Sequence, residues 1–281
     1  MSNGPPMTRI PHPRTHSFFR TALAAILIGT WALPTSVHAQ IAVVGSTVEE
    51  HTAAPGQRYE GTILVRNLTT TPQSVRVYQT DYRFFADGTS HFDDAATTPR
   101  SNARWVTPSA TALVIPPSSE ITLGYTITVP AIDTLRGTYW SAIMIEGAPT
   151  APPLAANKQV GIGAVMRYAV QLATHLPTPG SRTVAFANQT QSTDSAGHRV
   201  VELDVQNVGE RGYRPNMWVE LYDAAGALRG RREQQRGLLY PGTSLKQRFV
   251  FDALPAGSYK AVVFADTGDD AVFAAQYKLD F

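Results

Sequence analysis

The chain has 281 residues, of which 43% are hydrophobic and 16% charged, and its formal net charge is +2. This is an ordinary balance for a globular protein of one or two domains. The absence of cysteine excludes a disulfide framework, a lipid-modified cysteine and a thiolate zinc site.

The first 39 residues have the pattern of a secretory signal. Three arginines precede an uncharged apolar run, Thr21 to Leu33, which Pro34 ends. Small residues at Val37 and Ala39 then form a cleavage site. A retained membrane anchor is the weaker alternative, because the apolar run is shorter than the ~20 residues that a spanning helix needs. We therefore expect a signal peptide over 1–39, cut after Ala39, and a periplasmic or secreted protein.

Removal of this segment changes the charge of the protein. Residues 1–39 hold three of the 24 basic residues and no acidic ones, which leaves 21 basic against 22 acidic residues and a net charge near −1. Bulk charge therefore gives no reason to expect nucleic acid or an anionic surface as a partner.

From residue 40 onward, apolar residues recur at a spacing of two in short runs separated by Pro, Gly, Asn and Asp. This period is typical of β-strands. In the first half of the chain it predicts strands over 59–66, 74–85, 121–129 and 137–147. The pair Asp87-Gly88 after the second of these runs predicts a tight hairpin turn, where glycine accepts a positive φ. A loop rich in proline and alanine then covers 148–158.

The stretch from Val160 to Leu172 is apolar or small at every second residue, and the positions between are hardly polar. A strand with one face in water should alternate more cleanly. Gly161 and Gly163 have no side chains, so another backbone could approach this part of the second face closely. That backbone is either a partner's strand or the protein's own, since both faces of the stretch can also be buried within the protein itself.

The second half predicts seven short strands, over 183–187, 200–207, 216–222, 228–233, 245–251, 258–264 and 271–281. Seven strands in about 100 residues with regular turn signals are typical of an immunoglobulin-like sandwich. We therefore predict an all-β protein with two tandem immunoglobulin-like β-sandwiches after a cleaved signal peptide. The expected boundaries are 40–177 for the first domain, 178–180 for a linker and 181–281 for the second domain.

No motif in the sequence points to catalysis, a metal or a cofactor. The four histidines after residue 39 stand in no metal-binding spacing, and no nucleophile or dinucleotide motif is present. We expect no enzyme, although a triad assembled from distant residues stays open. The basic run Arg229, Arg231, Arg232 and Arg236 is interpreted as a charged edge strand that resists aggregation, with an anion-binding patch as the less favoured alternative.

The layout resembles a known family. A signal peptide, two cysteine-free sandwiches, the segments "PGQRYEGTILVRN" and "GTYWSAIMIE" and a long alternating strand resemble the periplasmic pilus-assembly (PapD-like) chaperones. In that family the last strand of the first domain follows a flexible loop and lends alternating apolar residues to a subunit that lacks its own final strand. The resemblance implies a non-catalytic chaperone-like protein that binds a secreted pilus or surface subunit by strand addition. It implies a partner-binding row of Val160, Ile162, Ala164, Met166, Arg167, Tyr168 and Val170.

The sequence departs from this family in one respect. The family anchors a subunit's terminal carboxylate with an Arg near the mature N-terminus and a Lys late in the donor strand. The start "QIAVVGSTVEE" has no Arg, the expected Lys position holds Leu172, and Arg167 is only a nearby substitute.

A second resemblance implies another function. The segments "RGTYWSAIMIE" and "VGIGAVMRYAVQL" also resemble the peptidoglycan-binding sandwich of the WxL-binding surface proteins, whose C-terminal membrane anchor has no counterpart in "AAQYKLDF". The alternative function is therefore a cell-envelope module that binds peptidoglycan or a surface protein.

Overall fold

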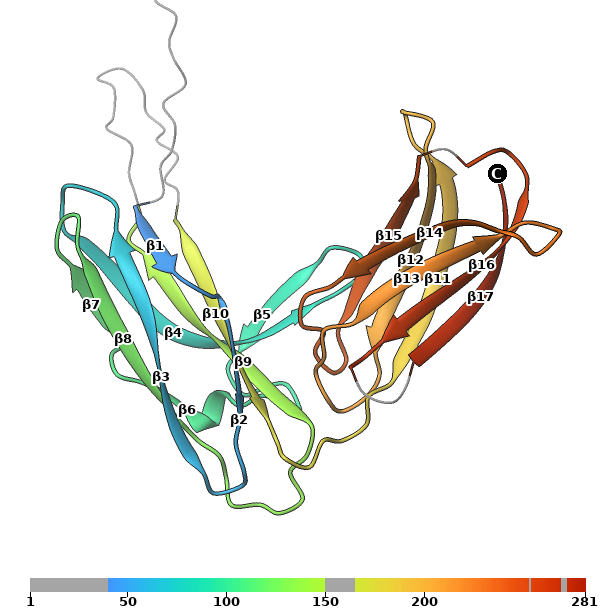
Figure 1. Cartoon of the computed structure of the whole chain (residues 1–281). Helices are drawn as coiled ribbons and strands as arrows, with labels where there is room; N and C mark the ends of the chain where they lie inside the picture. The colour runs from blue at the N-terminus through green and yellow to red at the C-terminus, as the bar shows by residue number, and fades with distance from the viewer. Residues whose placement is uncertain (1–39, 150–164, 253, 269–271) are drawn as a thin grey trace, which may run out of the picture. The chain divides into compact units, whose positions relative to one another are not determined.

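Strands form nearly all of the regular structure (Figure 1). The computed structural model describes residues 40–149, 165–252, 254–268 and 272–281, and the only helix in these ranges is a 3₁₀ turn, Ala103–Trp105. The expected signal peptide and most of the expected loop at 148–158 lie outside the described residues. Ala39–Phe281 forms one unit, and both sandwiches lie within it.

The first sandwich contains ten strands in two sheets. One sheet has the order β1-β3-β8-β6, and the other has the order β2-β10-β9-β4-β5, with β7 paired to β4. The strands are β1 (Ile41–Val44), β2 (Val48–Thr52), β3 (Arg58–Asn67), β4 (Gln73–Phe84), β5 (Ser90–Asp94), β6 (Val106–Pro108), β7 (Ala112–Ile115), β8 (Glu120–Thr128), β9 (Thr138–Gly147) and β10 (Arg167–His175).

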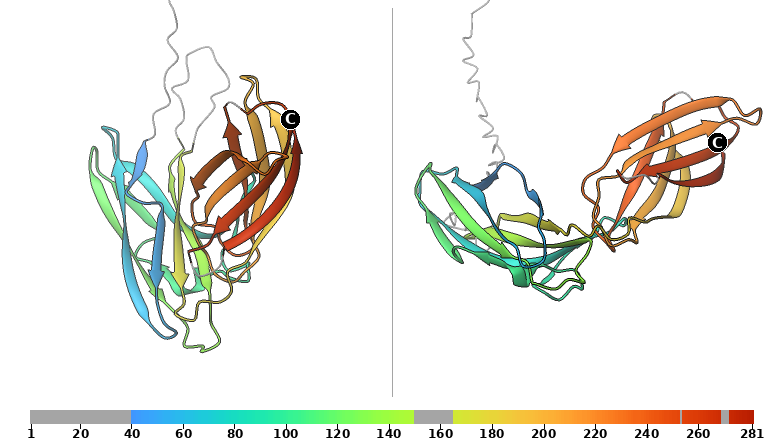
Figure 2. Two further views of the ribbon diagram at one scale, coloured as in Figure 1. Left: turned by 45° about the vertical axis from the view of Figure 1, so that its right-hand side comes forward. Right: turned by 60° about the horizontal axis from the view of Figure 1, so that its bottom comes forward.

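The alternation of side chains builds the core between these two sheets. Ile63 on β3, Leu123 on β8, Ile143 on β9 and Leu172 on β10 all lie in one buried cluster. Figure 2 shows the two layers of each sandwich from two further directions. The four strands that the sequence predicts for the first half, before residue 148, correspond to β3, β4, β8 and β9. The short strands β1, β2, β6 and β7 were not predicted, because none of them is long enough to show a period of two.

The second sandwich has one sheet of order β11-β12-β15 and one of order β14-β13-β16-β17. All seven predicted strands are present, so the expected all-β double sandwich is confirmed. They are β11 (Val184–Thr193), β12 (Arg199–Asn207), β13 (Asn216–Tyr222), β14 (Leu228–Gln235), β15 (Ser244–Phe251), β16 (Ser258–Asp266) and β17 (Val272–Asp280). Only β11 differs clearly in length, because it continues past a bulge between Ala187 and Thr190.

The predicted hairpin at Asp87-Gly88 joins β4 to β5. Gly88 has a φ of 87°, which a side chain at this position would disfavour. The backbone N–H of Thr89 donates to Oδ1 of Asp87 over 2.9 Å and closes the turn. The local sequence therefore determines this connection.

A glycine in the middle of β3 makes room for a tyrosine. Gly61 lies opposite Tyr125 on β8, and a Cβ at Gly61 would stand 2.2 Å from the Tyr125 ring. Tyr125 is buried, and burial raises the pKa of its hydroxyl to about 12. The ring therefore lies over bare backbone, an arrangement by which sheets fill the space beside a strand glycine.

We predict that Gly61→Ala lowers the free energy of unfolding by about 1–3 kcal/mol, because the added methyl group overlaps the buried ring of Tyr125. Urea denaturation measures the change. Gly124→Ala is the matched control, since its Cβ would meet only the side chain of Ser109, at 3.7 Å or more. Equal effects of the two substitutions would contradict this account of Gly61.

Candidate functional site

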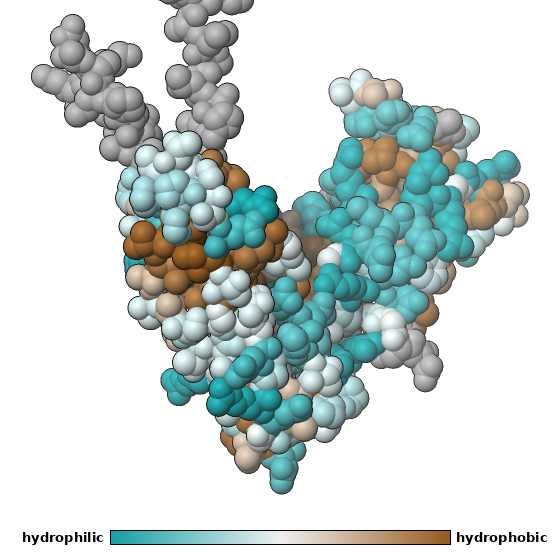
Figure 3. Space-filling model, turned by 60° about the vertical axis from the view of Figure 1, so that its left-hand side comes forward, coloured by the Kyte–Doolittle hydropathy of each residue, from teal (hydrophilic) through white to brown (hydrophobic). Residues whose placement is uncertain are grey.

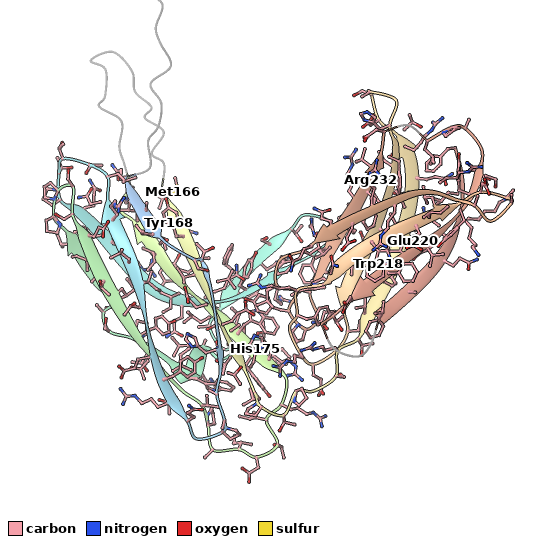
Figure 4. The ribbon with its side chains drawn as sticks, viewed as in Figure 1. Met166, Tyr168, His175, Trp218, Glu220 and Arg232 are labelled. Carbon is pink, nitrogen blue, oxygen red and sulfur yellow. The ribbon has the colours of Figure 1, made fainter. Side chains whose placement is uncertain are left out.

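The strand at which the sequence predicts partner binding is β10. Of the expected partner-binding row, Val160, Ile162 and Ala164 lie outside the described residues. Met166 directly precedes β10, Arg167, Tyr168 and Val170 lie in its N-terminal half, and His175 lies at its other end (Figure 4).

The two sides of β10 are paired over different lengths. On one side β9 pairs with it in antiparallel fashion from Arg167 to His175. On the other side β2 pairs with it in parallel fashion, but only from Gln171 to His175. In the described part of the chain, the stretch from Arg167 to Val170 is therefore paired on the β9 side alone.

Two hydrogen bonds show which backbone groups face the unpaired side. Gly147 N–H donates to Met166 C=O over 3.0 Å, so the even-numbered residues of β10 bond to β9. Gln171 N–H donates to Thr47 C=O over 2.8 Å, so the odd-numbered residues face the β2 side. The N–H and C=O groups of Arg167 and Ala169 therefore point to an open sheet edge. We call this stretch, Arg167–Val170, the open edge of β10.

The side chains beside the open edge are apolar on the inner face. Met166 is 41% exposed, and Tyr168 is half-buried against the core, with its hydroxyl donating to Ile41 C=O over 2.9 Å. Val43 on β1 packs against the same core. Val170 is fully buried in that core, so its side chain is not available at the surface. Figure 3 shows hydrophobic side chains gathered on the face of the first sandwich.

The outer face beside the open edge carries an ion pair. Arg167 lies 2.8 Å from Glu146 of β9, and the hydroxyl of Tyr78 donates to the same carboxylate over 2.8 Å. Burial, together with this hydrogen bond, raises the pKa of Tyr78. Arg167 is thus already paired with Glu146, and Leu172 is an uncharged, buried side chain, so neither offers a free cation for a carboxylate.

The C-terminal half of β10 is covered on both faces. Ala173 belongs to a buried cluster with Trp140, Leu238 and Tyr240, in which the rings of Trp140 and Tyr240 stack 4.7 Å apart. Tyr240 also donates its hydroxyl to Gln171 over 2.9 Å. This explains why Ala173 is apolar on the second face, and it shows that the protein's own residues cover that face here.

Three polar residues at the end of β10 have the connectivity of a catalytic triad. Thr138 Oγ1 lies 2.8 Å from His175 Nδ1, and His175 Nε2 lies 3.2 Å from Glu50 Oε2. Thr138, however, is 0% exposed, and its hydroxyl oxygen accepts the N–H of Gly212 over 2.8 Å. A nucleophile has to reach its substrate, so this chain of hydrogen bonds is structural.

The carboxylate of this chain has a second partner. Arg214 donates to the other oxygen of Glu50. The hydrogen bond with His175 lowers the pKa of Glu50 and Arg214 lowers it further, while desolvation opposes both. The ionised form of Glu50 is therefore favoured in the folded protein.

We predict that Glu50→Gln destabilises the protein at about pH 7 and that the difference from the parent shrinks toward about pH 3. A carboxyl group with a lowered folded-state pKa stabilises the fold above its unfolded pKa, and this contribution disappears as the pH falls through the folded pKa. Urea denaturation at several pH values measures it. Glu60→Gln is the control, because Glu60 pairs only with exposed Arg58. A difference independent of pH would contradict an electrostatic role.

Three of the four arginines in the basic run have partners within the second sandwich. Arg229 bonds Asp223 over 2.6 Å, Arg231 bonds Glu233 over 3.0 Å, and Arg232 bonds Val250 C=O over 2.8 Å. They lie on β14, an edge strand, which supports the interpretation as a charged edge. Over the described ranges, no three His, Asp or Glu side chains come together as a metal site would require. None of the helical structure in those ranges is long and apolar enough to cross a membrane.

No protein-family model and no curated protein matches this sequence. Among solved structures, the chain is similar to CfaA, a chaperone of class 5 fimbriae, with a TM-score of 0.44 and 11% identity over 84% of this chain and 98% of that chain. The E. coli chaperone DraB has a TM-score of 0.39 and 14% identity, with coverage of 86% and 98%. The Pseudomonas aeruginosa chaperone CupB2 has a TM-score of 0.36 and 12% identity, with coverage of 85% and 100%. Fimbrial chaperones are thus among the solved structures to which this chain is similar in fold.

Proposed function

We propose that this protein is a non-catalytic, chaperone-like protein of the periplasm that binds a secreted pilus or surface subunit by β-strand addition at the open edge of β10. The observation that carries the proposal is the unequal pairing of β10, which directs the backbone groups of Arg167 and Ala169 at an edge that no described strand occupies. Strand addition uses such groups for affinity and the alternate side chains for specificity.

The surroundings of the edge suit an alternating partner strand. On the inner face, an added strand would lie beside Met166, Tyr168 and Val43, which favour apolar side chains. On the outer face it would lie beside Arg167 and its partner Glu146, which favour polar ones. We infer that the bound segment is extended, with apolar residues at every second position on its inner face.

The period of two in the sequence places three more residues in the row of Met166 and Tyr168. These are Val160, Ile162 and Ala164, and we include them in the proposed binding row. We also propose the boundaries 40–177 and 181–281 for the two domains, with 178–180 as the linker. The export of the chain to the periplasm after cleavage at Ala39 belongs to the same proposal.

We predict that a photo-reactive amino acid at Met166 crosslinks to one secreted protein in the native host and that the same probe at Val114 does not. Val114 is 63% exposed on β7 of the same sandwich and serves as the matched position. In the purified complex, amide exchange at Arg167 and Ala169 should slow at least tenfold, because a paired strand edge protects its N–H groups. A crosslink without this protection would overturn strand addition.

We predict further that Met166→Lys weakens binding of the crosslinked protein about tenfold or more, since a charge replaces apolar area at the edge. Val114→Lys should leave the affinity unchanged, and isothermal titration calorimetry measures both. Equal affinities of the Met166→Lys and Val114→Lys variants would contradict a binding site at the open edge of β10. If the protein co-sediments with purified peptidoglycan and the Met166→Lys variant does so equally well, the result would instead support the envelope-binding alternative.

A further inference from the structure

The last strand of the chain forms a second open edge, in the other sandwich. β17 pairs with β16 along its length and stands at the end of its sheet. Hydrogen bonds in both directions between Gly257 and Phe281 set the alternation, so the odd-numbered residues of β17 bond to β16. The N–H and C=O groups of Val272, Ala274, Gln276 and Lys278 therefore point away from the sheet.

One residue of this outward row already has a partner. The side chain of Gln191 donates to Asp280 C=O over 2.6 Å and accepts from Asp280 N–H over 3.0 Å. A side-chain amide thus occupies the place that a neighbouring strand would take at Asp280. This side-chain contact is confined to Asp280. Among the described residues, no backbone or side chain bonds to the outward groups from Val272 to Lys278.

The other edge strands of this sandwich carry features that oppose pairing. β11 has a bulge at which Asn188 takes a φ of 50°, and β14 carries three arginines. β15 carries Lys246 and Arg248 on its exposed positions. The stretch of β17 from Val272 to Tyr277 has no proline, bulge or charge, and edge strands of this kind pair readily with other chains.

We propose that β17 pairs antiparallel with β17 of a second copy of this chain, about a two-fold axis at Ala275. In this register Val272 faces Lys278 of the second copy, and Ala274 faces Gln276 of the second copy. All the outward backbone groups between Val272 and Lys278 then find partners. The two four-stranded sheets join into one continuous sheet, and the interface is isologous, as in most protein dimers.

The same register pairs the aromatic residues of the inner face. Phe273 and Tyr277 are half-buried against their own core and keep part of each ring exposed. About the axis at Ala275, Phe273 lies opposite Tyr277 of the second copy in a non-hydrogen-bonded pair, where cross-strand side chains approach most closely. Between Val272 and Lys278 no like charges face each other. This self-complementarity is the reason to name a second copy rather than another protein.

The test introduces charges on the exposed outer face, where Ala274 and Gln276 point into water. The double variant Ala274→Lys/Gln276→Lys places lysine opposite lysine twice across the axis and should weaken dimerisation at least tenfold. The matched variant Ala274→Lys/Gln276→Glu places lysine opposite glutamate and should restore it. Sedimentation equilibrium from about 1 to about 200 µM measures the dimerisation constant of each form.

Three outcomes would overturn the dimer. They are a parent protein that stays monomeric over the whole range, equal dimerisation of the two double variants, and the absence of concentration-dependent amide protection at Ala274 and Gln276. The proposal is independent of strand addition at β10, so Met166→Lys should leave the dimerisation constant unchanged. A dimer that Met166→Lys dissolves would place the interface on β10 and refute this one.

Discussion

The unequal pairing of β10 is the constraint on which the rest of this structure depends. Each residue of a strand directs its backbone N–H and C=O to one side only, so every second residue needs a partner on each side. β9 satisfies one side along all of β10, whereas β2 satisfies the other side only from Gln171 onward. The sandwich is therefore closed at one end of β10 and open at the other.

The closed end is held by more than the ladder. Asn102 is fully buried and donates to Leu172 C=O and to Thr174 Oγ1, each over 3.0 Å. The hydrogen bonds that run from Gly212 through Thr138 and His175 to Glu50 join the start of β9 and the end of β10 to the middle of β2. Because buried polar groups are costly to leave unpaired, these bonds fix the C-terminal half of β10. Among the described residues, the N-terminal half is held by the bond from Tyr168 to Ile41 C=O and by the surface ion pair of Arg167 with Glu146. This is the part of the strand that we propose accepts a partner.

The two open edges differ in what surrounds them. The open edge of β10 has an apolar inner side at Met166 and Tyr168 and an ion pair at Arg167, so its two neighbouring faces are chemically unlike. The edge of β17 is uncharged from Val272 to Tyr277, and its residues complement one another about Ala275. An asymmetric edge suits a different protein, and a self-complementary edge suits a copy of the same chain.

The sequence by itself determined the longer strands and one hairpin turn. The period of two located β3, β4, β8, β9 and the strands of the second sandwich, because alternation of side chains follows from local backbone geometry. Asp87-Gly88 likewise specified its own hairpin. The absence of cysteine likewise excluded stabilisation by disulfides or by a thiolate zinc site.

Only the tertiary structure decided which edges are open. The stretch around Leu172 is apolar on both faces, and sequence alone could not separate a partner's strand from the protein's own residues there. Trp140 and Tyr240 cover Ala173, whereas no described strand pairs with the outward backbone groups of Ala169, four residues earlier. Where β2 begins depends on long-range pairing between residues more than a hundred positions apart. Local patterns report which way a side chain points and not which strand lies beside it, so the edges had to come from the fold.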